Sequence, residues 1–484
     1  MIRVRKNVNE LTDDTLLWYS KAVESMKQKD ITDPSSWWYQ GAIHGYGLDK
    51  RPNLANNESW SESSVWEQAE GFPPSEGLVN SQFWQQCQHG TWFFLPWHRM
   101  YLQFFEAIVA KTVVELGGPK DWTLPYWNYC DANNPALNPT EQLQALKLPS
   151  EFGTNTPNPD FPGLWMKERA QYQLSSQADA SCSVAMKLQN FTASSPATSF
   201  GGVQTGFSHD SGTFGAVENN PHNLVHVDIG GAMGDPNTAA LDPIFWLHHA
   251  NIDRLWQCWI DQGRENTNDI TWLNQVFDFH NADSLPDTLS VKDVLSTEAL
   301  GFTYSDSYSS SAAPTDSKVF ALASAGGSGM FDTIAATTKP FLLGSQSTSA
   351  QLEFLPEKQR AAQVPVLGAS NSQTPNQVII VLDNVTGSGV VAPVSVYVKA
   401  SANSERVLVG KIGLFGLTQS STPSSTSCLE QGISIELDVT DALQQLRSQT
   451  NWNLENLQIE LEPGRELGNA SVTVGRVSIK AEVV

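Results

Sequence analysis

Four of the nine histidines in this chain of 484 residues lie within 28 positions of one another, at His222, His226, His248 and His249. His222 and His226 follow Asn220-Pro221, a pair typical of a helix start, and their spacing of four places both imidazoles on one face of that helix. Neutral imidazole is a ligand suited to copper and zinc. One metal ion could therefore bind both side chains.

His249 lies on a second expected helix, which begins at Asp242-Pro243 and carries Phe245 on the same face. Asp253 lies one turn further on, where its carboxylate could accept a hydrogen bond from a metal-binding histidine. His248 points about 100° away from its neighbour on a helix, so we expect it to pack or hydrogen-bond rather than to ligate. The expected ligands of this site are therefore His222, His226 and His249.

A second set of three histidines precedes this one in the sequence. It consists of His44, followed by His89 and His98 in "CQHGTWFFLPWHRMYLQFFE". An HxxxH pair alone is more often a pair of ordinary histidines, and this one lacks the glutamate of the HExxH zinc proteases. Two sets of three favour metal binding. His209 and His280 remain outside both sets, and we expect them to be solvated or structural.

The stretches "HGTWFFLPWHRMYLQFFE" and "DPIFWLHHANIDRLW" resemble the two copper-binding signatures of the tyrosinase, catechol oxidase and haemocyanin family. The resemblance covers roughly residues 1–305. It implies a bundle of antiparallel helices that holds two copper ions per chain, with O₂ and small phenols as the molecules that react there. The implied ligands are His44, His89 and His98 for one copper, and His222, His226 and His249 for the other.

The resemblance also implies roles for two residues beside the ligands. Cys87 stands two positions before His89, and this pair resembles the thioether by which some family members bond a cysteine sulfur to a copper ligand. The alternative is a free buried cysteine. Phe245 resembles the family phenylalanine that packs on the ligands.

Three further residues bear on the choice between a tyrosinase and a catechol oxidase. Glu218 and Asn223 stand where the family has a glutamate that holds a water and an asparagine that helps to orient it. Both could instead be ordinary helix-start residues. Pro236 stands where many plant enzymes carry a bulky phenylalanine, which implies a wider entrance. These features favour activity on monophenols.

The predicted function is that of a copper-dependent phenol oxidase, which hydroxylates monophenols to o-diphenols and oxidises o-diphenols to o-quinones. Three alternatives stay open at this point. One is a catechol oxidase that lacks monophenolase activity, and another is a haemocyanin-like oxygen-binding protein. The third is a hydrolytic zinc protein, because sites of three histidines also support that chemistry.

Two domains joined by a linker are expected. Helical periodicity predicts a mainly α domain over residues 1–304, and a segment rich in Ser, Ala, Gly and Thr over residues 305–376 predicts the linker. Residues 377–484 alternate short β-rich runs with turns, which predicts a β-sandwich or barrel. This domain weakly resembles the C-terminal domain of plant polyphenol oxidases, which covers the copper entrance. Its "GLFGL" offers Leu414 or Phe415 as the residue that plugs the site.

Composition excludes several partners. Fifty-one acidic and 29 basic residues give a net charge of −22, which repels nucleic acid and anionic membrane surfaces. No apolar run long enough for a membrane span and no secretory signal is recognisable, so we expect a cytoplasmic protein. The five cysteines form no CxxC pair and are odd in number, which does not indicate a disulfide framework. The sequence does not determine the oligomeric state.

Overall fold

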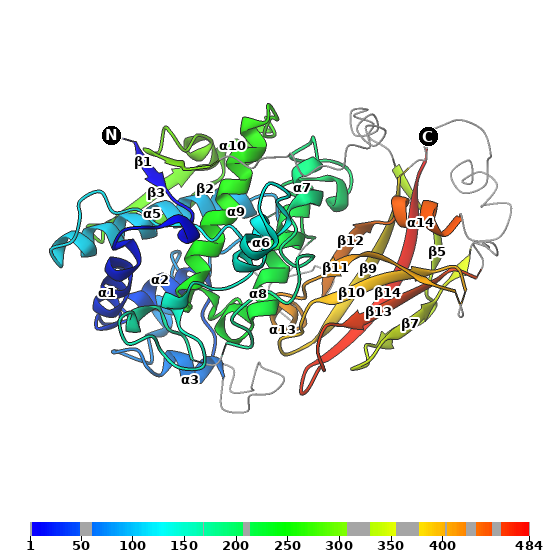
Figure 1. The fold of residues 1–484 in the computed structure, drawn as a ribbon, viewed down its shortest axis with the longest axis horizontal. Coiled ribbons are helices and arrows are strands. Elements are labelled where there is room, and N and C mark those ends of the chain that lie inside the picture. The colour runs from blue at the N-terminus through cyan, green and yellow to red at the C-terminus, as the bar shows by residue number, and fades with distance from the viewer. Residues whose placement is uncertain are drawn as a thin grey trace.

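The computed structural model describes residues 2–48, 61–167, 169–206, 213–306, 330–354, 377–401, 404–422, 432–447 and 456–483. The chain divides into a helical part, up to residue 306, and a strand part, from residue 330, which lie side by side (Figure 1). Each part has its own cluster of buried apolar side chains. Two phenylalanines cross between the parts: Phe415 of the strand part belongs to the cluster of the helical part, and Phe214 of the helical part belongs to the cluster of the strand part. Among the described helices, none combines the length and the apolar character that a bilayer span requires.

The helical part carries most of the α-helices. They are α1 (Thr15–Lys27), α2 (Trp37–His44), α3 (Glu62–Trp66), α4 (Glu76–Val79), α5 (Phe94–Glu115), α6 (Pro139–Ala145), α7 (Ser183–Lys187), α8 (Leu224–Ile229), α9 (Ile244–Asp261) and α10 (Ile270–Asn274). A short wide helical turn, Glu218–Asn223, leads into α8.

Helices α5 and α9 are the two longest described helices, and they pack against each other. Helix α5 begins at Phe94, and it is followed by Gly117 with φ 87°, a conformation that favours glycine. Helix α9 begins as predicted after Asp242-Pro243, where the Asp242 carboxylate accepts a hydrogen bond of 3.1 Å from the Ile244 N–H. Both helices are buried on nearly every side, so their positions are set by packing.

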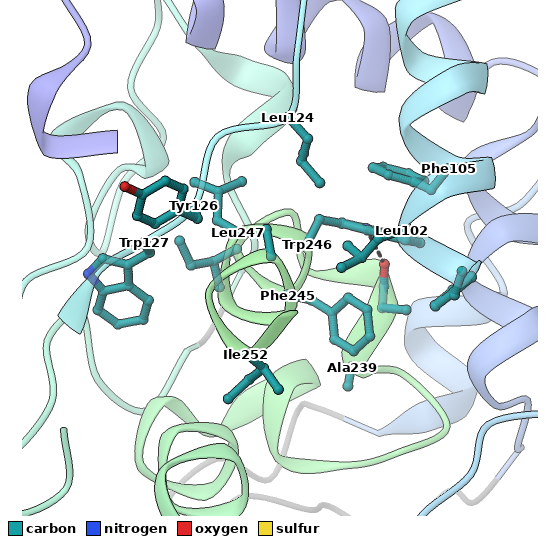
Figure 2. Packing of buried hydrophobic residues seen from close by; sticks show 14 of the residues in the cluster. Leu102, Phe105, Leu124, Tyr126, Trp127, Ala239, Phe245, Trp246, Leu247 and Ile252 are labelled. Carbon is teal, nitrogen blue, oxygen red and sulfur yellow. Dashed lines mark hydrogen bonds between the residues drawn. The ribbon is translucent and has the colours of Figure 1, made fainter. Parts of the chain in front are cut away.

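Large aromatic side chains fix the spacing of α5 and α9. The rings of Phe105 and Trp246 stack with their centroids 3.3 Å apart, and Figure 2 shows Leu102 and Phe245 beside them. The Trp246 indole N–H donates a hydrogen bond of 3.1 Å to the Ala240 carbonyl. Burying one large apolar side chain stabilises a fold by about 1.5–3 kcal/mol. This packing therefore holds the histidines of the two helices at a fixed separation.

Short strands join the two ends of the helical part. Strand β1 (Arg3–Arg5) pairs in parallel with β4 (Phe302–Tyr304), and the Arg5 guanidinium lies 3.8 Å from the centre of the Phe302 ring. Strands β2 (Val276–His280) and β3 (Pro286–Ser290) form an antiparallel hairpin. Strand β4 thus lies near the end of the helical part, beside its N-terminal strand.

The strand part contains two antiparallel sheets. One has the order β11-β10-β13-β7, and the other has the order β12-β9-β14-β5-β8, with β6 paired to β14. Their bounds are β5 (Met330–Ala336), β6 (Phe341–Leu342), β7 (Thr348–Gln351), β8 (Glu353–Phe354), β9 (Val378–Ser388), β10 (Val394–Lys399), β11 (Arg406–Ile412), β12 (Ile433–Asp438), β13 (Gln458–Pro463) and β14 (Ser471–Val483). The helices α13 (Leu417–Ser420) and α14 (Thr440–Arg447) accompany them.

The predicted linker, residues 305–376, is too long. Strands β5 to β8 fall within it, and β5 pairs with β14 while β7 pairs with β13. These strands are rich in Ala, Ser and Thr, so their apolar alternation is weak, and they become strands because long partners hydrogen-bond to them. Residues 307–329 and 355–376 lie outside the described residues.

The expectation about cysteines is also wrong in one respect. Cys130 and Cys182 form a disulfide across 52 positions of sequence, between two loops of the helical part. No sequence spacing signals this pair, because tertiary folding alone brings the two loops together. Cys87 and Cys258 are buried and take no part in this disulfide, and Cys428 lies outside the described residues.

Candidate metal centre

The six predicted ligands come from six segments of the helical domain. His44 is the last residue of α2, His89 lies in the segment before α5, and His98 lies on α5. The second set consists of His222 at the wide turn, His226 on α8 and His249 on α9. All six side chains are buried.

The structure gathers these histidines into two adjacent clusters. In the first, donor atoms of His44, Cys87, His89 and His98 lie within 4.8 Å of one another, and in the second those of His222, His226, His248 and His249 do the same. The clusters touch, because the His98 and His249 rings stack with centroids 4.3 Å apart. Each cluster has the size and the nitrogen donors that a single metal ion needs.

Most of these imidazoles are oriented by a hydrogen bond at Nδ1. The Nδ1–H of His44 donates to the Pro236 carbonyl at 2.7 Å, that of His98 to the Phe94 carbonyl at 2.8 Å, and that of His226 to the Met233 carbonyl at 2.7 Å. His222 uses the Asn223 side-chain oxygen in the same way, at 2.9 Å. A donor at Nδ1 leaves the Nε2 lone pair for a metal.

The state of the Nε2 atoms supports a metal between them. His222 Nε2 is buried without a hydrogen-bond partner among the described residues, and His226 Nε2 lies 3.2 Å from His249 Nε2. Burial lowers the pKa of His98 and His226 to about 3, and it lowers the pKa of His222 and His249 well below the usual range. The imidazoles are therefore neutral and able to ligate.

His248 and His249 both lie in the second cluster and differ in their contacts. His249 has its Nε2 beside His226 and its ring against His98. The Tyr129 hydroxyl lies 3.0 Å from His248 Nδ1, and His248 Nε2 is buried without a hydrogen-bond partner among the described residues. The choice of His249 over His248 as the ligand therefore stays a prediction.

Cys87 lies against the ligands of the first cluster. Its Sγ is 3.4 Å from His89 Nε2 and 3.7 Å from His89 Nδ1, which brings the sulfur close to the carbon between the two nitrogens, Cε1. The same sulfur is 3.4 Å from His98 Nε2. This contact is compatible with a cysteine–histidine thioether.

Phe245 and Asp253, both predicted to support the ligands, behave differently. The Phe245 ring packs 4.2 Å from the His249 ring and 4.9 Å from the His44 ring, as predicted. The Asp253 carboxylate instead accepts hydrogen bonds from two arginines and a tyrosine, which are Arg5, Arg99 and Tyr304. Asp253 thus anchors α5 to α9, since two buried guanidinium groups demand a carboxylate more strongly than a neutral ring does.

Glu218 and Asn223 lie at the edge of the two clusters. Glu218 Oε1 accepts a hydrogen bond of 2.8 Å from the Gly90 N–H, directly after His89. Its Oε2 and the Asn223 Nδ2 are buried without a hydrogen-bond partner among the described residues. Burial raises the pKa of Glu218 well above its usual range. Both residues therefore have an unused polar atom in the interior.

The strand part covers the second cluster. The Phe415 ring stacks on His226 with centroids 4.1 Å apart, and it lies 5.3 Å from the His89 ring and 5.7 Å from the His222 ring. Leu414, the other candidate plug, packs into the core of the strand part. Phe415 is thus the residue that reaches the histidines.

Polar contacts that the sequence does not signal surround this ring. Lys411 pairs with Asp179 at 2.9 Å, and the Gln419 side-chain amide donates to Asp235 at 2.8 Å. Arg465 lies 3.7 Å from the Asp228 carboxylate. The partners are more than 180 positions apart in sequence, so only the assembled fold reveals them.

Known families match most of the chain. Residues 34–262 match the common central domain of tyrosinase, residues 266–312 the polyphenol oxidase middle domain, and residues 330–482 a domain of unknown function (DUF7868). A curated tyrosinase of Hahella sp. (strain CCB-MM4) is 45% identical over 489 residues, with 100% of both chains covered. A chloroplastic polyphenol oxidase of Malus domestica is 30% identical over 60% of this chain and 46% of its own length.

Solved structures share the fold. A latent aurone synthase (polyphenol oxidase) superposes with a TM-score of 0.62 at 18% identity, covering 100% of this chain and 90% of that one. A latent apple tyrosinase superposes with a TM-score of 0.60 at 21% identity, covering 99% and 97%. The chain therefore belongs to the tyrosinase family, whose members bind copper, and is an oxidoreductase of the tyrosinase and catechol oxidase type.

Proposed function

We propose that this chain hydroxylates monophenols to o-diphenols and oxidises o-diphenols to o-quinones with two copper ions. His44, His89 and His98 would hold one ion, and His222, His226 and His249 the other. The anchored Nδ1 atoms and the neutral, inward-facing Nε2 atoms support this assignment. When bound, the copper pair would supply O₂ binding and accept electrons from the phenol.

The observation that carries monophenol activity is the pair of unused buried atoms, Glu218 Oε2 and Asn223 Nδ2. A phenol has a pKa of about 10, so it reacts as phenolate only after a base has taken its proton. One water between these atoms would satisfy both of them and could receive that proton. The raised pKa of Glu218 brings its carboxylate nearer to the range of an effective base at neutral pH.

The entrance supports the same reaction. The Pro236 carbonyl holds His44, and a side chain placed on Gly416 of the strand part would meet the Pro236 ring at 3.6 Å. A proline ring at this position is smaller than the phenylalanine of many plant enzymes. A monophenol therefore meets less obstruction there once the strand part is displaced.

We further propose that the strand part keeps the enzyme latent. The Phe415 ring covers His226 and takes the space beside the ligands that a phenol ring would need. Phe415 belongs to the strand part, which has its own core. Displacement of the strand part would therefore remove the ring without unfolding the helical part that holds the histidines.

The test uses the copper-loaded chain before and after it is cut at a protease site placed within residues 307–329. We expect the cut chain to oxidise both p-cresol and 4-methylcatechol faster than the uncut chain does. Asn223→Ala should lower the rate on p-cresol about tenfold more than the rate on 4-methylcatechol, because only the monophenol needs the water-mediated proton transfer. Asn138→Ala, which removes the cap of α6, is the matched control and should leave the ratio of rates unchanged.

Two results would decide against the proposal. Equal losses on both substrates in Asn223→Ala, or oxidation of 4-methylcatechol without any oxidation of p-cresol, would make the chain a catechol oxidase. Reversible O₂ binding without turnover of either phenol would make it an oxygen carrier.

A further inference from the structure

The segment that carries the plug alternates between two environments. Ile412 and Leu414 point into the core of the strand part, whereas Lys411, Gly413 and Phe415 meet the helical part. An extended backbone turns alternate side chains to opposite faces. Strand β11 ends at Ile412, and Phe415 lies in the turn that follows. Residues 411–415, which we call the lid segment, therefore contact the helical part through alternate side chains.

Each of the three facing residues meets a distinct feature. The Lys411 ammonium donates to both oxygens of the buried Asp179 carboxylate, at 2.9 and 3.1 Å, and to the Ser176 hydroxyl at 3.0 Å. A side chain placed on Gly413 would come within 2.6 Å of the Asn223 backbone. The Phe415 ring stacks on His226. The helical part thus contacts the Lys411 ammonium, the Gly413 backbone and the Phe415 ring, which follow one another at intervals of two residues.

The stretch of sequence that carries the second cluster is acidic. Between Lys187 and Arg254 the chain contains no lysine or arginine, but it contains six aspartate and glutamate residues. Arg465 supplies a second cation from the strand part, 3.7 Å from the Asp228 carboxylate. When the strand part is displaced, Asp179 loses Lys411 and Asp228 loses Arg465. Both carboxylates can then pair with a cation of a new ligand.

We propose that this surface binds extended peptide substrates in which a tyrosine lies four residues after a lysine or arginine, and that the lid segment occupies it as a pseudosubstrate. This inference rests on the proposed function and names a substrate class for the same site. The reaction would convert one tyrosyl ring and one O₂ to the o-quinone and one water, with all four electrons of O₂ reduction coming from the ring.

Binding is the first test, because it needs no turnover. The probe is a fluorescent peptide of residues 408–418, LVGKIGLFGLT, whose phenylalanine cannot be converted to a quinone. The receptor is the full chain cut within residues 307–329 after folding, with the strand part removed by chromatography. We expect fluorescence anisotropy to show binding to this receptor and none to the uncut chain, whose site is filled.

Two altered peptides test the individual contacts. The Lys411→Gln peptide should have a Kd about tenfold higher, as expected for loss of a charge-assisted hydrogen-bonded pair. The Gly413→Val peptide should not bind, because its side chain would overlap the Asn223 backbone. In an Asp179→Asn receptor the Lys and Gln peptides should have equal Kd values. Asp283→Asn, which neutralises an exposed acid beside Lys111, is the matched control and should keep the tenfold difference.

Turnover is the second test. The peptide with tyrosine in place of Phe415 should be oxidised by the cut chain with about tenfold higher kcat/KM than its Lys411→Gln form, while 4-methylcatechol should be oxidised equally by the cut parent and cut Asp179→Asn chains. If 4-methylcatechol is not oxidised at all, the proposed function fails, and the binding test still decides the peptide site.

Equal Kd values for the Lys and Gln peptides on the parent receptor would overturn the proposal, as would a tenfold difference that survives in Asp179→Asn. If Asp179→Asn does not fold, a salt series on the parent receptor decides instead. The Kd of the Lys peptide should then rise toward that of the Gln peptide with ionic strength, and parallel curves would overturn the proposal.

Discussion

Replacing Phe415 with alanine should activate the uncut chain. The ring is 2% exposed and stacks 4.1 Å from His226, so the strand part buries it against the helical part in the closed arrangement. Truncating a buried phenylalanine to alanine typically costs about 3–5 kcal/mol. This burial is present only when the two parts are docked, so the substitution lowers the free energy gained on docking rather than the stability of either part.

The size of the effect follows from that free energy. Each 1.4 kcal/mol changes an equilibrium tenfold, so a loss of about 3 kcal/mol raises the ratio of open to closed chains by about two powers of ten. The smaller side chain also leaves space beside the ligands when the parts stay docked. We expect the initial rate on 4-methylcatechol, expressed per bound copper, to rise toward that of the cut chain.

Leu414→Ala is the matched control for this substitution. Leu414 is equally buried, but it packs in the core of the strand part, so its loss should lower the melting temperature without clearing the site. If Phe415→Ala is no faster than the parent chain, the ring is not what closes the site. Equal activation by both variants would attribute latency to the stability of the strand part.

Three other predictions follow from the site. His249→Ala should lose bound copper and all oxidase activity, whereas His248→Ala should keep its copper; metal analysis showing the reverse would place the ligand at His248. If Cys87 forms a thioether with His89, the peptide mass should be lower by two hydrogen atoms, and Cys87→Ser should restore the unlinked mass. The Gln419 amide of the strand part donates a hydrogen bond of 2.8 Å to the Asp235 carboxylate of the helical part, and a charged acceptor makes such a bond stronger. The uncut Asp235→Asn chain should therefore be more active on 4-methylcatechol than the uncut parent when each is compared with its cut form, and an unchanged ratio would show that this contact does not hold the two parts together.

The ligands could be predicted because their signals are local. His222 lies in the wide turn that leads into α8, four positions before His226, and the apolar period of α9 places His249 on the same face as Phe245. Local spacing also separates His249 from His248, since neighbours on a helix point in different directions. Residues that act within one helix or turn are thus within reach of sequence reasoning.

Long-range partners were beyond that reasoning. Asp253 is one turn from His249, which suggests a ligand anchor, yet its carboxylate is used by Arg5 and Arg99. Their side chains reach it from 248 and 154 positions away. A buried guanidinium group requires a carboxylate wherever the fold provides one, and the sequence does not show which carboxylate that will be. The same limit applies to the Cys130–Cys182 disulfide.

Different contacts of the lid segment close the site and fix the register of the segment. Burial of the Phe415 ring is non-directional, so by itself it would also accept Leu414 or Ile412 over the histidines after a shift in register. A shift of one residue turns the opposite face of an extended segment to its partner. That shift would remove Lys411 from Asp179 and would press a side chain against the Asn223 backbone where Gly413 now lies. The ring therefore closes the site, while the ion pair and the glycine determine which residue does so.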